Sequence, residues 1–271
     1  MDKVVVYCGT RNIYQIMEVS AKSMLVHTPV DCVYFLIEDD TFPSPLPDII
    51  QTINVSGQEW FKKDGPNYYS AWTYMAFIRL ALAKILPELH VALYLDTDTL
   101  VLNDASQIFN TNVNGKLFGM IQEDIGDIPL ELCNSFSFAG SNILMFQSDN
   151  PRPEYCIRPY YNSGVMLMNL DEMRSTGMDD VLIHELNTVQ YGYPDQDAIN
   201  LLCADRIEPI PLEYNVIPAI CPDFPFDKIR IKHFASEKPL WKSSLWQSYK
   251  RLSWQDVMQK QNALKEREAN A

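Results

Sequence analysis

Two aspartates, Asp96 and Asp98, flank Thr97 directly after the apolar run at residues 91–95 (VALYL). An uninterrupted apolar run of this length indicates a buried strand. Carboxylates two residues apart at the end of a strand can both turn toward one cation, and their hard oxygen atoms suit magnesium, manganese or calcium. A solvated turn is the alternative, because turns favour aspartate. The strand that precedes the pair favours the metal-binding interpretation.

The first hundred residues predict the sheet that positions this pair. Strands are expected at residues 3–8, 32–37, 91–95 and, from a weaker signal, 53–55, and helices at residues 14–27 and 70–86. Strands that are apolar throughout and alternate with helices are typical of a parallel sheet covered on both faces. We therefore predict an α/β fold with a Rossmann-like, mostly parallel sheet flanked by helices. Ligands of such sheets bind beyond the carboxyl ends of the strands, which here means residues 8–12 and 96–98.

The rest of the chain predicts a long loop region and a few further elements. Residues 122–161 are rich in Pro, Asn, Ser and aromatic residues with little periodicity, which indicates a functional loop. Strands are expected at 165–170 and 229–233, helices at 171–191 and 195–203, and helical structure from 241 onward. Ile229, Ile231 and His233 alternate on one face of the last strand, so we expect His233 to point inward. An inward histidine is often a core residue, but a facing carboxylate pair favours a metal ligand.

No internal repeat and no linker-like segment interrupts the sequence, so a single domain over residues 1–271 is expected. Within this domain, residues 242–271 are expected to form a C-terminal helical tail.

The composition excludes some classes of partner. A formal net charge of -13 at pH 7 argues against a nucleic-acid partner. Residues 228–271 nevertheless hold ten Lys and Arg against four Asp and Glu, so an anionic ligand is expected near this segment. The six cysteines lack metal-ligand spacing and predict reduced thiols. Apolar runs are far shorter than the roughly 20 residues of a membrane span, so we expect a cytoplasmic protein with at most peripheral contact with the inner face of a membrane.

Three classes of protein could use an Asp-x-Asp pair after a strand. Haloacid-dehalogenase-like phosphatases use the first aspartate as a phosphorylated nucleophile, and residues 95–101 (LDTDTLV) fit that pattern. That motif normally opens its domain, however, and the acidic pair required downstream could only be Asp179 and Asp180. Nucleotide-sugar glycosyltransferases use the pair to hold a divalent ion on the donor diphosphate. The third class is a catalytically inactive binder of a metal or a nucleotide-sugar.

Six ordered segments distinguish among these classes. They are VVVYCGTRNIY from residue 4, FIRL from residue 77, LYLDTDTLV from residue 93, YNSGVMLMNL at 161–170, PDQDAIN at 194–200 and HFASEKPLW at 233–241. On these segments the chain from about residue 3 to about residue 241 resembles glycosyltransferase family 8. This group includes bacterial lipopolysaccharide galactosyl- and glucosyltransferases and glycogenin. A lone Asp-x-Asp is a weak signal, whereas six segments in the order of the family are specific.

The resemblance implies a GT-A fold and a retaining transfer of a hexose, glucose or galactose, from a UDP-sugar to a saccharide or glycoconjugate acceptor. It also implies that residues 1–121 form the half that binds nucleotide and metal, and that residues 122–241 form the half that binds sugar and acceptor, with the acceptor expected at residues 122–161. Asp96 and Asp98 match the metal-binding carboxylates of the family, and His233 matches the histidine that completes the metal site. Mn²⁺ is the usual ion and Mg²⁺ the alternative. The metal and nearby cations would stabilise the negative charge that develops on the departing diphosphate.

The resemblance also implies which residues bind the donor nucleotide and diphosphate: Cys8, Thr10, Asn12, Arg79, Thr97, Ser236 and Lys238. Arg79 matches the family arginine on the donor side, and its guanidinium can hold phosphate or bridge to the sugar. Thr10 stands where many members have an acidic residue that reads the uracil edge. Ser236 stands where the common pattern has glycine, and Lys238 does not directly precede a Pro-Trp pair as it does in that pattern.

The sugar side of the donor site is implied to consist of Asn162, Gly164, Asp195, Gln196 and Asp197. Gly164 is expected just before a strand, where it permits close approach of the backbone to a ligand. Asp195 is implied to contact sugar hydroxyls, with a helix N-cap as the alternative. Gln196 is implied to face the reacting carbon, where an amide fits front-side transfer in which the leaving phosphate takes the acceptor proton. A nucleophilic role of Asp197 is the alternative.

Overall fold

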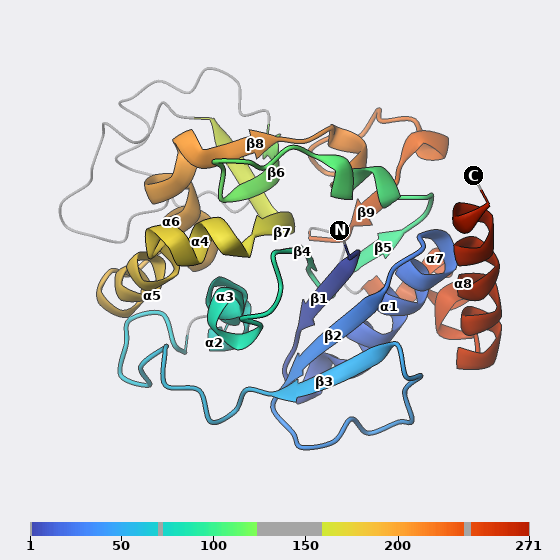
Figure 1. The fold of residues 1–271 in the computed structure, drawn as a ribbon, viewed down its shortest axis with the longest axis horizontal. Coiled ribbons are helices and arrows are strands. Elements are labelled where there is room, and N and C mark those ends of the chain that lie inside the picture. The colour runs from blue at the N-terminus through green and yellow to red at the C-terminus, as the bar shows by residue number, and fades with distance from the viewer. Residues whose placement is uncertain (1, 70–72, 124–158, 236–239, 271) are drawn as a thin grey trace.

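The computed structural model describes residues 2–69, 73–123, 159–235 and 240–270, and its main sheet has seven strands in the order β3-β2-β1-β4-β7-β6-β8 (Figure 1). The strands are β1 (Val4–Cys8), β2 (Cys32–Ile37), β3 (Ile50–Asn54), β4 (Val91–Leu95), β6 (Phe118–Glu123), β7 (Tyr160–Asn169) and β8 (Ile207–Pro209). A separate two-stranded sheet pairs β5 (Thr99–Val101) with β9 (Ile231–His233). The helices are α1 (Tyr14–His27), α2 (Thr73–Phe77), α3 (Leu82–Ile85), α4 (Leu170–Thr176), α5 (Met178–Thr188), α6 (Pro194–Cys203), α7 (Ser244–Lys250) and α8 (Trp254–Ala269).

Strands β1 to β4 form a parallel part of the sheet, as predicted. Strand β1 pairs in parallel with both β2 and β4, and β2 pairs in parallel with β3. Every residue of β1 and β4 is buried, which is why their sequences are apolar throughout instead of alternating. The predicted bounds of α1, β2 and β4 are confirmed to the residue. Strand β3 begins at Ile50, three residues before the weak signal at residue 53.

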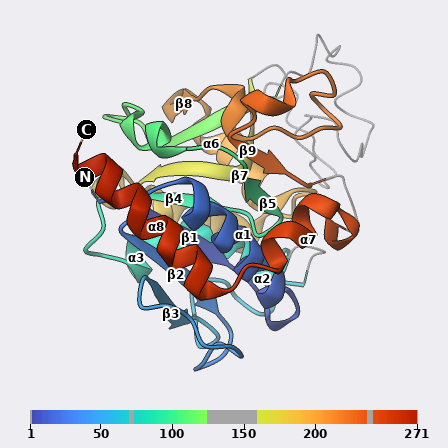
Figure 2. The same cartoon turned by 90° about the vertical axis from the view of Figure 1, so that its right-hand side faces the viewer.

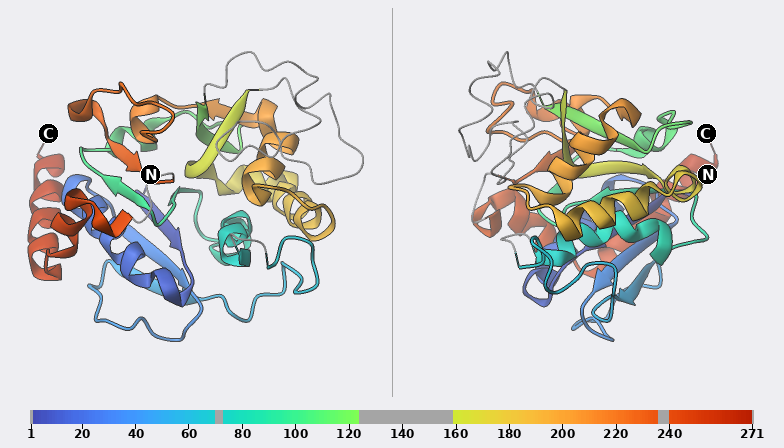
Figure 3. Two further views of the ribbon diagram at one scale, coloured as in Figure 1. Left: turned by 180° about the vertical axis from the view of Figure 1, so that it is seen from behind. Right: turned by 90° about the vertical axis from the view of Figure 1, so that its left-hand side faces the viewer.

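Helices cover both faces of the sheet. Helix α1 lies on one face, and α8 lies across it (Figure 2), with Met17, Met24 and Val257 in one buried apolar cluster. Helices α2 to α6 lie on the opposite face, where Phe77 and Ile199 join a second cluster (Figure 3). The helical segment predicted at 70–86 is confirmed over residues 73–85, as α2, a 3₁₀ turn and α3. The fold is thus the predicted mostly parallel sheet flanked by helices.

Strand β7 departs from the parallel pattern. It runs antiparallel to β4 on one side and to β6 on the other, and it begins at Tyr160, five residues before the predicted start at 165. Gly164 therefore lies inside a strand and not before one, which corrects the sequence prediction. The neighbouring Asn162 and Ser163 are buried although they are polar. Sequence patterns missed the first five residues of this strand because they cannot show that buried polar groups find hydrogen-bond partners.

The C-terminal part of the chain supplies β9 and two helices. Strand β9 is shorter than predicted, but Ile229, Ile231 and His233 are all buried, which confirms the inward placement of this face. Helices α7 and α8 confirm the helical structure predicted beyond residue 241. In the part of the chain that the structure describes, no helix is both long enough and apolar enough to cross a membrane. The four cysteines described there carry free thiols.

Candidate active site

The Asp-x-Asp pair meets His233 where the two sheets adjoin. Asp96 and Asp98 follow β4, and β5 pairs antiparallel with β9 so that Thr99 lies opposite His233. The Nε2 atom of His233 lies 3.3 Å from Oδ1 of Asp98 and 3.7 Å from Oδ2 of Asp96. One ligand atom from each of the three residues lies within 4.8 Å of the others. Strand pairing thus brings together residues that are far apart in the sequence.

This Asp-Asp-His group fits a divalent cation. Two carboxylates and one imidazole offer the oxygen and nitrogen ligands that Mn²⁺ and Mg²⁺ sites use. Burial lowers the pKa of His233, but the charges of Asp98 and Asp96 raise it, and the net shift is upward. A field that stabilises a proton on the imidazole also stabilises a metal cation at the same place. The donor atoms and the local field therefore both suit the ion.

The backbone of Gly164 lies directly against this group. A Cβ atom at residue 164 would lie 2.2 Å from Cε1 of His233 and 3.0 Å from Oδ2 of Asp96, so only glycine leaves room for both side chains. The carbonyl of Gly164 accepts a hydrogen bond of 2.7 Å from the backbone amide of Asp96. The register between β6 and β7 shifts here and skips residues 163–165. Bulges of this kind re-aim backbone groups beside active sites.

Arg79 joins the metal-binding group to the predicted sugar side. Its Nη2 lies 2.9 Å from Oδ1 of Asp96, and its Nη1 lies 3.4 Å from Oδ2 of Asp195. Nη1 also donates to the carbonyl of Ser163 at 2.9 Å, and the guanidinium lies 4.1 Å from the ring centre of Tyr94. Burial lowers the pKa of Arg79, but Asp195 and Asp96 outweigh it and raise the pKa. The guanidinium is therefore a fixed positive charge between two carboxylates.

Asp195 is buried near the start of α6, and one of its carboxylate oxygens makes an ion pair but no hydrogen bond within the described residues. The helix begins at Pro194 with Tyr193 as its N-cap, so Asp195 is not the cap. Its Oδ2 makes no hydrogen bond to any residue that the structure describes, and its contact with Arg79 is an ion pair. Burial raises the pKa of Asp195, with Arg79 acting in the opposite direction. Because a buried oxygen without a hydrogen bond is costly, a ligand hydroxyl would be favourable here.

The two residues that follow Asp195 are held in different ways. The Oε1 of Gln196 accepts from the backbone amide of Ser163 at 3.0 Å, which ties α6 to β7 beside the site. Asp197 is fully buried, and its two oxygens accept from the Tyr160 hydroxyl at 2.6 Å and the Tyr193 amide at 2.9 Å. A carboxylate engaged on both oxygens is suited to a structural role. The roles predicted for Gln196 and Asp197 in the reaction stay predictions.

Sequence reasoning missed Asn215 and Glu123. The Oδ1 of Asn215 lies 2.9 Å from Nδ1 of His233, and its Nδ2 donates to Oδ1 of Asn162 at 2.8 Å. The Nδ2 of Asn162 in turn donates to Oε1 of Glu123 at 2.8 Å. All four side chains are buried. No sequence signal marks them, because a single asparagine after a 3₁₀ turn and a glutamate at a strand end are common on protein surfaces.

The predicted nucleotide segment follows β1 at the same edge of the sheet as Asp96, because β1 and β4 are parallel neighbours. Cys8 is buried at the end of β1, and this burial raises the pKa of its thiol to about 12. Thr10 and Thr97 are half-buried, and Asn12 is exposed. The contacts of these four residues with the donor stay predictions.

Some predicted residues lie outside the described part of the chain. These are Ser236, Lys238 and residues 124–158, which make up most of the predicted acceptor region. Tyr160 and Tyr161, from the end of that region, are buried in β7. The roles predicted for Ser236 and Lys238 stay predictions.

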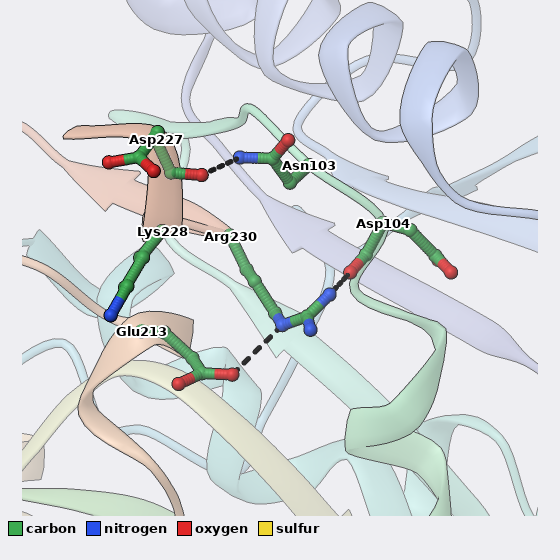
Figure 4. Close-up of a pocket in the computed structure, with 6 residues that line it drawn as sticks. All are labelled: Asn103, Asp104, Glu213, Asp227, Lys228 and Arg230. Carbon is green, nitrogen blue, oxygen red and sulfur yellow. Dashed lines mark hydrogen bonds and ion pairs between the residues drawn. The ribbon is translucent and has the colours of Figure 1, made fainter. Parts of the chain in front are cut away.

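Two other groups of polar residues make contacts of their own, separate from the Asp-Asp-His group. Asp179 and Asp180, the pair that a phosphatase would require, both form ion pairs with Lys84. In a separate pocket Arg230 donates to Glu213 at 2.9 Å and also to the Asp104 carbonyl (Figure 4). The residues that line this pocket are Asn103, Asp104, Glu213, Asp227, Lys228 and Arg230. None of the predicted site residues that the structure describes lines this pocket.

Comparison with known sequences identifies a family. The sequence profile of glycosyl transferase family 8 matches residues 4–244. The chain is 24% identical over 212 residues to the probable glycosyl transferase Gly of Streptococcus gordonii, covering 73% of this chain and 27% of that protein. It is 26% identical over 152 residues to the lipopolysaccharide 1,2-glucosyltransferase of Escherichia coli K12, covering 55% and 40%. The chain spans half the length or less of the curated relatives it matches.

Comparison with solved structures supports the fold. The bifunctional glycosyltransferase WbbM, in its apo form, matches with a TM-score of 0.68 at 16% identity, covering 96% of this chain and 51% of that one. The galactosyltransferase LgtC, in complex with donor and acceptor sugar analogues, matches with a TM-score of 0.60 at 16% identity, covering 91% and 95%. At this identity the likeness shows a shared GT-A-type fold. Because the family profile covers most of the residues and the fold agrees, the chain belongs to glycosyltransferase family 8.

Proposed function

We propose that this chain is a metal-dependent retaining hexosyltransferase that moves glucose or galactose from a UDP-sugar to a saccharide or glycoconjugate acceptor. The observation that carries the proposal is the convergence of Asp96, Asp98 and His233 beside the buried Arg79, which links them to Asp195. Family membership supports a nucleotide-sugar donor. A cytoplasmic location, with at most peripheral contact with a membrane, is part of the same proposal.

The reaction breaks the bond between C1 of the donor hexose and the β-phosphate oxygen. The bonding electrons stay with that oxygen, positive charge develops at C1 and the ring oxygen, and a bond forms from C1 to an acceptor hydroxyl oxygen. The acceptor proton passes to the released phosphate oxygen. A divalent ion held by Asp96, Asp98 and His233 would stabilise the negative charge on the diphosphate.

Arg79 and Tyr94 orient the carboxylate of Asp96. Its Oδ1 accepts from the Tyr94 hydroxyl at 2.8 Å and lies 2.9 Å from the Arg79 guanidinium. The other oxygen, Oδ2, is then the one that lies toward His233. Arg79 also supplies a permanent positive charge that offsets the carboxylates gathered around it. The donor diphosphate, which carries two negative charges, can therefore approach a site that also contains several carboxylates.

Asp195 and Gln196 suit the sugar and its reacting carbon. The Oδ2 of Asp195, which is ion-paired with Arg79 but accepts no hydrogen bond from the described residues, is a buried acceptor that a sugar hydroxyl can satisfy. Gln196 carries no charge, and its Oε1 is fixed by the Ser163 amide. A neutral, fixed amide near C1 leaves the proton transfer to the leaving phosphate, as retention by front-side transfer requires.

The test is a UDP-release assay with Mn²⁺ and a panel of UDP-sugars, with and without saccharide acceptors. We expect metal-dependent UDP release that falls by about 100-fold or more in Asp98→Asn and His233→Ala. The control is Asp64→Asn, which alters an exposed loop carboxylate and should leave the rate unchanged. NMR of the glycosylated product should show the anomeric configuration of the donor.

Three results would contradict the proposal in different ways. Hydrolysis of simple phosphomonoesters that disappears in Asp96→Asn, with UDP-sugars ignored, would indicate the phosphatase. Tight UDP binding without turnover on the whole donor panel would indicate an inactive nucleotide-sugar binder. A product of inverted configuration would refute retention while keeping the transferase.

A further inference from the structure

We propose that Asn215 is a positioning residue that fixes the tautomer of His233, so that Nε2 of the imidazole carries the lone pair offered to a metal ion. The inference rests on the proposed metal-dependent function. It starts from four buried side chains, Glu123, Asn162, Asn215 and His233, that are linked end to end by hydrogen bonds of 2.8, 2.8 and 2.9 Å. In this row each polar group depends on the orientation of the next.

A backbone amide decides the orientation of the row. The N–H of Gly164 lies 2.9 Å from the side chain of Asn162, and a backbone N–H can only donate, so the atom facing it is the oxygen Oδ1. The same oxygen is the partner of Asn215, so the Asn215 atom that faces it is the nitrogen Nδ2. The other Asn215 atom, Oδ1, faces His233. Because that oxygen can only accept, Nδ1 of His233 carries a hydrogen.

Glu123 holds the far end of the row in the same orientation. Its carboxyl oxygen Oε1 accepts from Nδ2 of Asn162 at 2.8 Å. If the Asn162 amide were turned over, its oxygen would face the carboxyl of Glu123 and its nitrogen would face the amide of Gly164. A buried polar group left without a partner in this way is strongly unfavourable. The row therefore has a single favourable arrangement.

The orientation of the row determines which ring nitrogen of His233 can bind a metal ion. With hydrogen on Nδ1, the Nε2 atom of neutral His233 presents its lone pair on the side where Asp98 and Asp96 lie. The other tautomer would instead present a hydrogen to an incoming cation. Histidines that bind metals usually donate their second ring N–H to such an acceptor, and loss of the acceptor weakens metal binding by about 10- to 100-fold.

The experiment uses the full chain with ¹⁵N-labelled histidine. The protein has four histidines, so long-range ¹H–¹⁵N spectra are simple, and a His233→Asn sample assigns the signals of His233. Spectra of the metal-free protein, at a pH where the ring is neutral, report the tautomer. Titration of Mn²⁺ followed by EPR gives the metal affinity directly. Neither readout requires glycosyl transfer.

Asn215→Leu removes the acceptor, whereas Asn215→Asp retains an oxygen toward Nδ1. Asn103→Leu is the control, because the Asn103 side chain also makes two hydrogen bonds, donating to the carbonyls of Asp227 and Ile229 near β9. Figure 4 shows that this contact with Asp227 lies in the separate pocket. If Asn215→Leu does not fold, Glu123→Leu tests the same row from its other end.

We expect Nδ1–H in the wild type, loss of this pattern in Asn215→Leu, and Mn²⁺ affinity lower by about 10- to 100-fold. Glu123→Leu should shift both readouts in the same direction, whereas Asn215→Asp and the control should keep the wild-type tautomer. Nε2–H in the wild type, or unchanged tautomer and affinity in Asn215→Leu, would overturn the inference. If that unchanged variant still turns over UDP-sugars, only this inference fails. If the wild type binds Mn²⁺ in the Nδ1–H form without turnover, only the proposed function fails.

Discussion

Replacement of Gly164 by alanine adds one methyl group at the metal-binding group without changing any charge. The new Cβ atom would lie 2.2 Å from Cε1 and 2.7 Å from Nδ1 of His233, and 3.0 Å from Oδ2 of Asp96. Ordinary van der Waals contact of a Cβ begins near 3.4 Å. The imidazole must therefore move by about 1.2 Å if the backbone stays in place, which is the difference between contact and the 2.2 Å approach.

Neither the backbone of Gly164 nor the imidazole of His233 can move easily. The carbonyl of Gly164 is bonded to the amide of Asp96, and the next residue, Val165, is paired with Leu95 in β4. The imidazole of His233 is hydrogen-bonded to a neighbouring buried asparagine at 2.9 Å. Overpacking of this kind costs about 1–3 kcal/mol, which lowers Tm by about 2–10 °C in a chain of this size. Displacement of a site group by about 1 Å can reduce the rate by about 100-fold.

The assay compares Gly164→Ala with two other glycine-to-alanine variants. Gly57→Ala meets no atom within 4 Å, and Gly119→Ala meets Ile210 at 3.2 Å in the core away from the Asp-Asp-His group. Thermal unfolding, Mn²⁺ binding and UDP release are measured on all three. We expect Gly57→Ala to match the wild type and Gly119→Ala to lose some stability only. Gly164→Ala should lose stability, metal affinity and turnover together.

One result would refute this reasoning. If Gly164→Ala retains Mn²⁺ affinity and turnover within about threefold of the wild type, which is under 1 kcal/mol, the imidazole is not confined by the backbone of β7. A Tm loss equal to that of Gly119→Ala, with metal binding unchanged, would lead to the same conclusion. The site would then depend on the side chains alone.

Three further predictions follow from buried polar groups. Arg79→Met should destabilise the fold by about 3–5 kcal/mol because it leaves buried carboxylate charge unpaired. The double variant Arg79→Met/Asp195→Asn should recover part of the lost Tm, and no recovery would show that the broken ion pair does not cause the destabilisation. Cys8 and Cys203 are buried, and burial raises the pKa of each thiol to about 12, so mass spectrometry should find neither alkylated in the native protein until the pH approaches that value. Asp197→Asn should lower stability by about 1–3 kcal/mol in thermal or urea unfolding, because the NH₂ group of asparagine would then face one of the two hydrogen-bond donors that Asp197 accepts from. An unchanged Tm would contradict the structural role of Asp197.

The sequence by itself determined the parallel part of the fold and one half of the metal site. The segments that became β1, β2 and β4 are recognisable because burial on both faces of a sheet demands continuous apolar residues, and α1 is recognisable from its helical composition. The end of β4 then fixes where Asp96 and Asp98 lie. The alternation of Ile229, Ile231 and His233 also predicted an inward histidine, which the structure confirms. These signals are local, since each depends on neighbouring residues in one element.

Only the tertiary structure decided which polar groups meet. Residues 160–164 look like a loop in the sequence, yet Asn162 and Gly164 lie inside β7, and their polar groups are satisfied by partners from other elements. Asn215 carries no sequence signal, because its role depends on the pairing of β5 with β9 beside it. Hydrophobic patterns report how deeply a residue is buried, but a hydrogen-bond partner far along the chain is set by strand register. The residues of the candidate metal site could therefore be named from sequence, whereas the row of buried side chains hydrogen-bonded to His233 could not.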